Sequence, residues 1–176
     1  LAGAAVAGDG RYRALRDIIA RTRPRFRGAV DKVQTTDLAE QRERAAALDE
    51  SYLVIQGPPG TGKTWTGARL VIDLIRRGRR VGVAATSHKA IHNLLDQIEE
   101  AADEEGVEFR GLKKSSADSA ETQYASTSIR SIDDPKEFAT AAPGAQLLAG
   151  TVWLFARGGL DSTLDTLVIG EAGQGG

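Results

Sequence analysis

The feature that most constrains the fold is the run GPPGTGKT at residues 57–64. It follows a short apolar stretch, SYLVIQ, and opens the helical pattern KTWTGARLVIDLIRRG. In that pattern Val71, Leu74 and Ile75 fall on one face, and Gly78 is placed to end the helix. The run matches the phosphate-loop pattern G-x-x-x-x-G-K-[ST] in full, between a predicted strand and a predicted helix.

This pattern predicts a nucleotide site with defined roles for its residues. Glycines let backbone N–H groups converge on a phosphate, and the helix that follows points its positive end at the same anion. The lysine reaches the β- and γ-phosphates, and the hydroxyl after it ligates Mg²⁺. The predicted nucleotide-binding residues are Gly57, Pro58, Pro59, Gly60, Thr61, Gly62, Lys63 and Thr64, with Thr64 also the metal ligand.

The rest of the chain alternates between strand-like and helical patterns. RRVGVAAT, LLAGTVWLFA and DTLVIG read as strands. SHKAIHNLLDQIEEAADEEG reads as a helix that begins after Ser87 and ends at Gly106. Its last turn is acidic and opposes the helix dipole, so we expect fraying there. Alternating strands and helices predict an α/β fold with a parallel sheet covered by helices on both faces.

Two regions depart from this alternation. An arginine-rich helical arm is expected over residues 1–36 and is interrupted at Pro24; a further helix begins at Asp37, with Glu40 completing a capping box. We place the nucleotide-binding lobe at residues 37–176. Within it, residues 111–144 are rich in Ser, Thr, Ala and Asp and read as a surface insertion or mobile loop with one short helix.

Composition excludes several classes of protein. The net charge of −1 gives no global basic field, so any nucleic-acid site must be local. The absence of cysteine excludes disulfides and thiolate metal sites and fits a cytoplasmic protein. No apolar run approaches the roughly 20 residues of a membrane helix, so we expect no membrane partner. The sequence contains no methionine, even at position 1, and we expect it to be part of a longer chain.

Four motifs, IQGPPGTGKT, TSHKAIHNLL, GTVWLFAR and EAGQ, occur in this order. Together they resemble the first RecA-like lobe of superfamily 1 helicases. The nearest branch includes the nonsense-mediated-decay helicase and bacterial proteins that join such a helicase to a RecB-type nuclease. The resemblance implies an incomplete RecA-like lobe of the P-loop NTPase class that binds ATP and Mg²⁺. It also implies a second RecA-like lobe, and a nuclease domain as a further candidate, in the parent chain.

The resemblance implies contacts with single-stranded nucleic acid, for which we expect DNA rather than RNA. TSHKAIHNLL takes the place of motif Ia, where Ser87, Lys89 and Asn93 would meet backbone phosphates; a simple helix cap at Ser87 with a solvated lysine is the alternative. Thr151 matches a threonine that in this family lies near the bound nucleic acid. Gln41 is a candidate for the glutamine that reads adenine, or a solvent-facing helix residue.

Other side chains near these motifs are assigned to packing. We expect Trp153 and Phe155 to lie in the core. His88 and His92 read as surface or packing residues.

The EAGQ motif implies Glu171 as the base that orients the attacking water and Gln174 as the link between nucleotide state and strand binding. Gly170 stands where the family has an aspartate that fixes the magnesium shell, and Asp165 lies too far upstream to replace it. The resemblance therefore implies an ATP hydrolase and translocase as the parent protein, whereas this chain binds nucleotide with little turnover. A P-loop ATPase that is no helicase, and a catalytically silent nucleotide-binding module, remain the alternatives.

Overall fold

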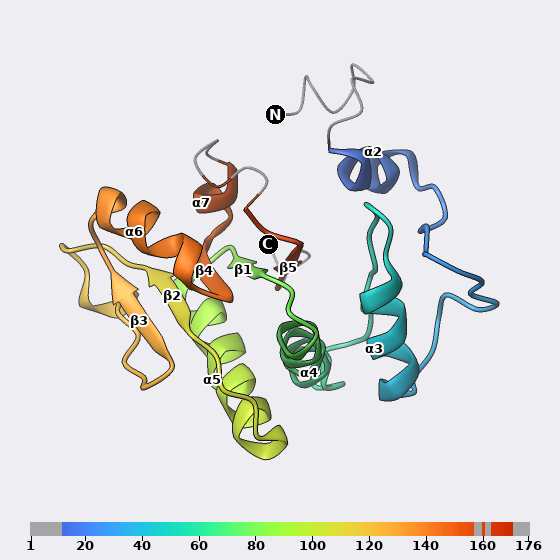
Figure 1. Ribbon diagram of the computed structural model, residues 1–176, viewed down its shortest axis with the longest axis horizontal. Coiled ribbons are helices and arrows are strands. Elements are labelled where there is room, and N and C mark those ends of the chain that lie inside the picture. The colour runs from blue at the N-terminus through green and yellow to red at the C-terminus, as the bar shows by residue number, and fades with distance from the viewer. Residues whose placement is uncertain (1–11, 157–159, 161–162, 171–176) are drawn as a thin grey trace. The chain divides into compact units, whose positions relative to one another are not determined.

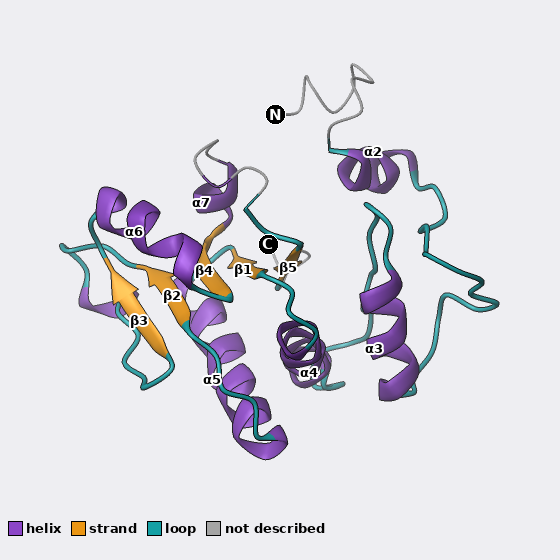
Figure 2. Cartoon of the chain, viewed as in Figure 1, coloured by secondary structure: helices purple, strands orange, loops and turns teal. Residues whose placement is uncertain are grey.

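The structure is a computed structural model that describes residues 12–156, 160 and 163–170. The chain divides into two compact units, residues 1–61 and residues 62–176, and each is described by itself. Figure 2 shows that all the strands belong to the second unit, with helices in both.

From residue 12 onward, the first unit holds two helices, α2 (Arg13–Ala20) and α3 (Leu38–Ala47). The predicted start of α3 is confirmed, because the Asp37 side chain accepts a hydrogen bond from the backbone N–H of Glu40 at 2.9 Å. The strand predicted at residues 51–56 is wrong: this segment forms no strand, and Val54 is 65% exposed. An apolar run becomes a strand only where a neighbouring strand pairs with it, and none of the five strands of the second unit does so.

The second unit alternates helices with strands as predicted. Helix α4 (Lys63–Arg76) is followed by β1 (Val81–Ala85), α5 (His88–Glu105), β2 (Gly111–Lys114), η1 (Ala120–Thr122), β3 (Ile129–Ile132), α6 (Pro135–Ala141), η2 (Ala142–Gly144), β4 (Leu147–Thr151), α7 (Val152–Ala156) and β5 (Thr166–Ile169).

The five strands form one parallel sheet in the order β3-β2-β4-β1-β5. Helices α4 and α5 cover one face, and α6 and α7 cover the other (Figure 1). This three-layer arrangement confirms the predicted α/β class with a parallel sheet and helices on both faces. It also carries the carboxyl ends of all five strands to one edge of the sheet.

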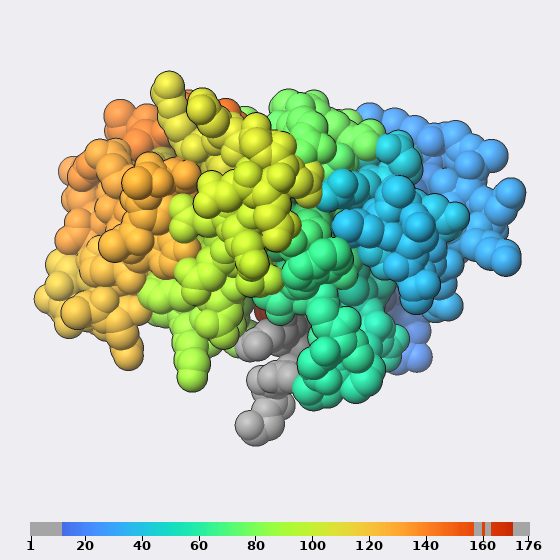
Figure 3. All heavy atoms as spheres, turned by 90° about the horizontal axis from the view of Figure 1, so that it is seen from below, coloured from blue at the N-terminus to red at the C-terminus, as the bar shows by residue number. Residues whose placement is uncertain are grey.

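The core of this unit has a part on each side of the sheet. On one side α4 packs along α5, and Figure 3 shows the outer surfaces of these two helices side by side. Their inward residues, which include Val71, Leu74, Ile75, Ile91 and Ile98, are buried as the helical spacing predicts. On the other side a second cluster is formed by Leu112, Ile132, Phe138, Ala142, Ala145 and Leu148.

The acidic end of α5 does not fray in the structure, which corrects the sequence-based expectation. The helix continues to Glu105, and Gly106 then caps it in the left-handed conformation, at φ 63°. Arg69 of α4 pairs with Glu104, and Arg76 pairs with Glu105. These arginines supply the positive charge that the helix dipole favours at this end, a contribution that sequence periodicity alone does not reveal.

The Ser/Thr-rich stretch at residues 111–144 is not the loop that its composition suggests. It contributes two strands of the sheet, β2 and β3, and only its one short helix, α6, was expected. Leu112, Ile129 and Ile132 of these strands are buried, so a few apolar residues at the right register suffice for a strand. Whether the lobe begins at residue 37 stays a prediction.

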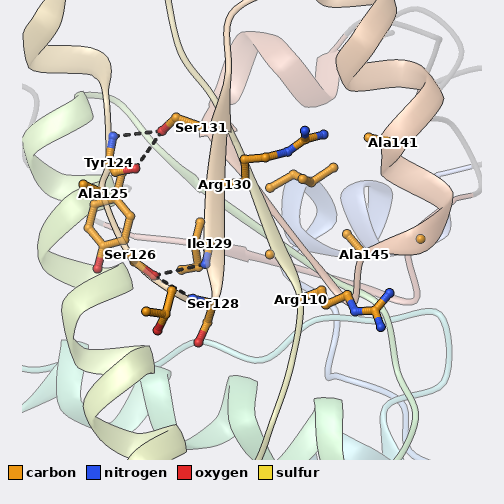
Figure 4. Close-up of a pocket in the computed structure, with 14 residues that line it drawn as sticks. Arg110, Tyr124, Ala125, Ser126, Ser128, Ile129, Arg130, Ser131, Ala141 and Ala145 are labelled. Carbon is orange, nitrogen blue, oxygen red and sulfur yellow. Dashed lines mark hydrogen bonds between the residues drawn. The ribbon is translucent and has the colours of Figure 1, made fainter.

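Polar side chains hold the connection between β2 and β3 in place. The Tyr124 hydroxyl lies 2.8 Å from carboxylate oxygens of Asp96 and Glu99 on α5. The Tyr124 backbone N–H and carbonyl both bond the Ser131 hydroxyl, and Ser126 receives two further backbone N–H groups (Figure 4). These bonds take the place of the apolar periodicity that the sequence lacks here.

Thr122 is the buried centre of this connection, and its removal tests whether the connection is ordered. Its hydroxyl accepts from Ser116 N–H at 2.8 Å and donates to the Ser119 carbonyl at 2.7 Å. We expect Thr122→Val to lower the free energy of unfolding by about 1–3 kcal/mol, because buried partners lose their hydrogen bonds. Thr140→Val, which removes an exposed hydroxyl from α6, should change it by less than about 0.5 kcal/mol. Urea titrations measure both; equal losses would contradict an ordered connection.

Candidate functional site

The pairing of β1 with β4 and β5 brings the residues of three predicted motifs to one edge of the sheet. Ala85, the last residue of β1, lies opposite Thr151, the last residue of β4. On the other side of β1, the Gly170 N–H donates to the Ala84 carbonyl at 2.8 Å. Thr151, the turn that follows β1 and Gly170 therefore lie next to one another, although they are far apart in the sequence.

Ser87 follows β1 and caps helix α5. Its side chain accepts a hydrogen bond from the Ala90 N–H at 3.2 Å, as the alternative interpretation of this residue requires. A hydroxyl has one proton and two lone pairs, so capping leaves the Ser87 proton available to a phosphate oxygen. The cap and the proposed contact are therefore compatible.

Lys89 and Asn93 lie on the first turns of α5, and both are exposed. Lys89 forms no ion pair with any residue that the structure describes. A cation near the N-terminus of a long helix adds to the positive end of the dipole. With Ser87, these two residues form a polar surface that suits an anion.

Thr151 ends β4 and is half-buried. The strand predicted to continue through VWLFA stops here, and the following residues form helix α7 instead. This change of direction corrects the expectation for Trp153, which is 73% exposed rather than in the core. Phe155 does pack inward, against the cluster on the α6 face.

Gly170 occupies an ordinary position that does not require glycine. A β-carbon built there would meet its nearest atom, Leu94 Cδ2, at 3.7 Å, and the Ala84 carbonyl oxygen at 3.8 Å. Both distances are normal van der Waals contacts. A steric clash at the β-carbon therefore does not explain the missing carboxylate.

Asp165 does not substitute for this carboxylate. It precedes β5 at the opposite end of the strand, where its side chain accepts a hydrogen bond from the Arg80 N–H at 2.7 Å and lies 3.8 Å from Arg79. The prediction that Asp165 is on the wrong part of the strand is confirmed. Glu171 and Gln174 lie outside the described residues.

The glycine-rich run adopts backbone conformations that favour glycine. Gly60 has φ 80°, and Gly62, which precedes the first residue of α4, has φ 76°. A β-carbon at Gly57 would lie 2.6 Å from the Thr61 Oγ1, which itself donates to the Pro58 carbonyl at 2.8 Å. The turn itself thus favours glycine at positions 60 and 62, whereas at Gly57 it is the Thr61 side chain that leaves no room for a β-carbon.

Lys63 and Thr64 begin α4 directly after this turn, and the Thr64 side chain is exposed. Gln41 lies on α3 and is half-buried; its amide donates to the Thr35 carbonyl at 2.8 Å. A role for Gln41 in reading adenine stays a prediction.

Sequence reasoning missed a group of polar residues beside the turn after β1. Lys113, in the stretch interpreted as a loop, is buried in β2 with its ammonium 3.2 Å from the His88 Nδ1. His92 and Tyr124 continue this group, with ring centroids 5.3 Å apart. The sequence gives no local signal for this group, because Lys113 stands in a polar stretch and meets His88, a residue 25 positions away.

A shallow pocket elsewhere in the unit is not the candidate site. Arg110, Gly111, Ile129 and Arg130 line it (Figure 4). These residues lie at or near the starts of β2 and β3, opposite the edge where the predicted site residues meet. The described residues contain no cluster of His, Cys, Asp or Glu that could hold a metal, and none of their helices is long and apolar enough to cross a membrane.

Comparison with known proteins agrees with this geometry. The family described as "AAA domain" matches residues 37–175. The mouse DNA-binding protein SMUBP-2 is 35% identical over 65 residues, which are 36% of this chain and 6% of that protein. The yeast DNA replication ATP-dependent helicase/nuclease DNA2 is 35% identical over 104 residues, 51% of this chain and 7% of that protein.

A third relative, the Drosophila melanogaster homolog of regulator of nonsense transcripts 1, is 45% identical over 53 residues, 30% of this chain and 4% of that protein. The chain thus spans less than a tenth of the length of these relatives. The resemblance to the first lobe of superfamily 1 helicases is confirmed over this part.

The cap at Ser87 gives a prediction that does not depend on any ligand. Ser87→Ala should lower the free energy of unfolding by about 1 kcal/mol, because the Ala90 N–H loses its partner. Ser87→Asp should retain the stability, because aspartate caps about as well as serine. Urea unfolding of the two variants measures this, and an unchanged stability in Ser87→Ala would show that the cap contributes nothing.

Proposed function

Because the chain belongs to the AAA-domain family, we propose that it is the ATP-binding lobe of a nucleic-acid-dependent ATPase that moves along a single strand. The observation that carries this proposal is the meeting of Ser87, Thr151 and Gly170 at one sheet edge. Three helicase-like motifs, distant in sequence, supply these residues.

The nucleotide would be held chiefly by backbone groups. The conformations of Gly60 and Gly62 fit a turn that wraps a phosphate, and α4 begins directly after it. Lys63 would contact the β- and γ-phosphates, and the exposed Thr64 hydroxyl would ligate Mg²⁺. When bound, ATP supplies the phosphoanhydride bond that is cleaved, and Mg²⁺ neutralises charge on its phosphates.

The single strand would cross the carboxyl edge of β1 and β4. Its phosphates would meet the Ser87 hydroxyl, the Lys89 ammonium, Asn93 and Thr151. We propose DNA rather than RNA as the strand, because two of the relatives are named as a DNA-binding protein and a DNA replication helicase/nuclease. A nuclease domain in the full-length protein is proposed on the second of these names, and a cytoplasmic location remains part of the proposal.

Turnover would require groups beyond those that hold the nucleotide. Glu171 is proposed to orient the attacking water, and Gln174 to link nucleotide state to strand binding. A second RecA-like lobe would supply arginines to the charge that develops on the γ-phosphate, a contribution of roughly 10³–10⁵ in rate. This chain by itself would therefore bind ATP and hydrolyse it slowly.

One observation favours a second candidate, a nucleotide-binding module without catalysis. Gly170 offers no carboxylate to the magnesium shell, although a β-carbon at this position would meet no clash. Tight nucleotide binding without turnover in the full-length protein would favour this module. ATPase activity that ignores single-stranded nucleic acid would instead favour a P-loop ATPase that is no helicase.

Substitutions of two lysines should affect ATP binding and binding of single-stranded nucleic acid separately. Lys63→Ala should abolish most ATP affinity and leave the affinity of the nucleotide-free, full-length protein for a single strand unchanged. Lys89→Ala should do the reverse and reduce the slope of log affinity against log salt by about 1, because one phosphate contact is lost. Calorimetry and strand-binding titrations measure the two affinities. Loss of both affinities in either variant, without unfolding, would contradict this assignment.

Gly170→Asp tests the missing carboxylate directly. In the full-length protein it should raise Mg²⁺-dependent ATPase activity by about 10–100-fold, as expected for a group that orders metal-bound water. Nucleotide affinity should change far less, because the loop and Lys63 make the direct contacts. Gly170→Asn has the same size without the charge and should give little increase. Steady-state ATPase assays with single-stranded nucleic acid decide; equal rates in the glycine and aspartate forms would reject this account of the site.

A further inference from the structure

Lys113 is a fully buried lysine that no motif explains. It is the third residue of β2, with 0% of its surface exposed. Its ammonium donates to the Thr122 carbonyl and lies 3.2 Å from the Nδ1 atom of His88. Among the residues that the structure describes, no carboxylate forms an ion pair with it. A buried charge without a counter-ion is costly, so a specific use for it is a reasonable expectation.

The chemistry of an ammonium group fixes the state of His88. A charged lysine has three donors and no acceptor, so the Nδ1 atom must accept this hydrogen bond. Neutral His88 then carries its proton on Nε2. This nitrogen has no hydrogen-bond partner among the described residues and is not one of their buried unpartnered atoms, so it is open to solvent.

The position of His88 places its Nε2–H donor beside the residues that are proposed to contact backbone phosphates. His88 is the first residue of α5 and lies between Ser87 and Lys89, the proposed phosphate contacts. We propose that His88 is a further strand-contact residue, whose Nε2–H donates to a backbone phosphate, and that Lys113 is the positioning residue that fixes its tautomer and ring. This inference rests on the proposed function, since it adds a contact to the same strand site.

The charges around the pair make this contact depend on pH. Burial, followed by the charge of Lys114, lowers the pKa of Lys113 to about 8. Burial, followed by the charges of Lys113 and His92, also lowers the pKa of His88, which is therefore neutral at pH 7. His92, Asp96, Glu99 and Tyr124 on one side, and Glu121 and Lys114 on the other, are the remaining titratable groups around the cluster.

The direction of the pH effect follows from the lowered pKa. Below about pH 8 Lys113 is an ammonium that can only donate, and His88 keeps its proton on Nε2. Above it Lys113 is a neutral amine that can also accept, so His88 is free to move its proton to Nδ1. The affinity of the protein for single-stranded nucleic acid should therefore fall as the pH rises through about 8.

A strand-binding titration at pH 7 and pH 9 tests the proposal in the full-length protein. The probe is a fluorescently labelled oligothymidylate at fixed salt. The wild type should lose about 2–10-fold in affinity at pH 9, the scale of the net contribution of one hydrogen bond. Lys113→Met should bind weakly at both pH values. Should Lys113→Met fail to fold, His88→Phe, which keeps a ring at a half-buried position, should show the same weak, pH-independent binding.

Lys114→Met is the matched control. Lys114 is the neighbouring lysine of β2, and its ammonium donates to the Ser115 and Asp133 carbonyls rather than to His88. This variant should keep the wild-type affinity at pH 7. Its fall in affinity should move to higher pH, because removal of a like charge raises the pKa of Lys113.

A measurement without nucleic acid completes the test. The chain has only two histidines, so ¹⁵N chemical shifts of the ring nitrogens can be assigned with His88→Phe. At pH 7 His88 should carry its proton on Nε2, and Lys113→Met should give a mixture of tautomers. A proton on Nδ1, or an unaltered pH dependence in Lys113→Met, overturns this inference alone. A wild type that binds no single strand overturns the proposed function, and the inference with it.

Discussion

The parallel pairing of β1 with β4 on one side and β5 on the other is the constraint on which the site depends. Each strand alone carries only small and aliphatic residues. Their common direction brings the segments that follow them to one edge, where Ser87, Thr151 and Gly170 meet. No helix packing could achieve this if one strand ran the other way, because its polar end would then lie at the opposite edge. The sheet therefore determines which of these residues lie next to one another.

Sequence reasoning succeeded where a local pattern and the tertiary structure agree. The start of α5 at Ser87 and the end of α4 near Gly78 follow from caps and periodicity, which act within a few residues. It failed at residues 51–56, where strand formation needs a partner, and at residues 111–144, where hydrogen bonds from Thr122 and Tyr124 order a polar segment. Both failures concern contacts between residues distant in the sequence, which composition does not encode.

The same limit applies to the candidate site. The glycine-rich run and the motif after β1 are visible as short patterns because each works through backbone geometry and adjacent side chains. Lys113 was invisible for the opposite reason: it lies 25 residues from His88, on another strand, within a stretch of low apolar content. Trp153 was misplaced because β4 ends at Thr151 and the chain turns into α7. A contact between residues distant in the sequence leaves no signal at either position.

Binding and turnover in this site depend on different kinds of group. The phosphates of a nucleotide would be held by backbone N–H groups of a turn whose geometry favours glycine at positions 60 and 62, so this capacity follows from the fold. Placement of the metal and the attacking water depends on side chains, and these change without any cost to the fold. Gly170 illustrates the difference, since a β-carbon there would lie in ordinary contact with Leu94 and Ala84. A loop that would bind phosphates and a carboxylate that would order a metal are therefore physically separate features, and a chain can lack the second while it keeps the first.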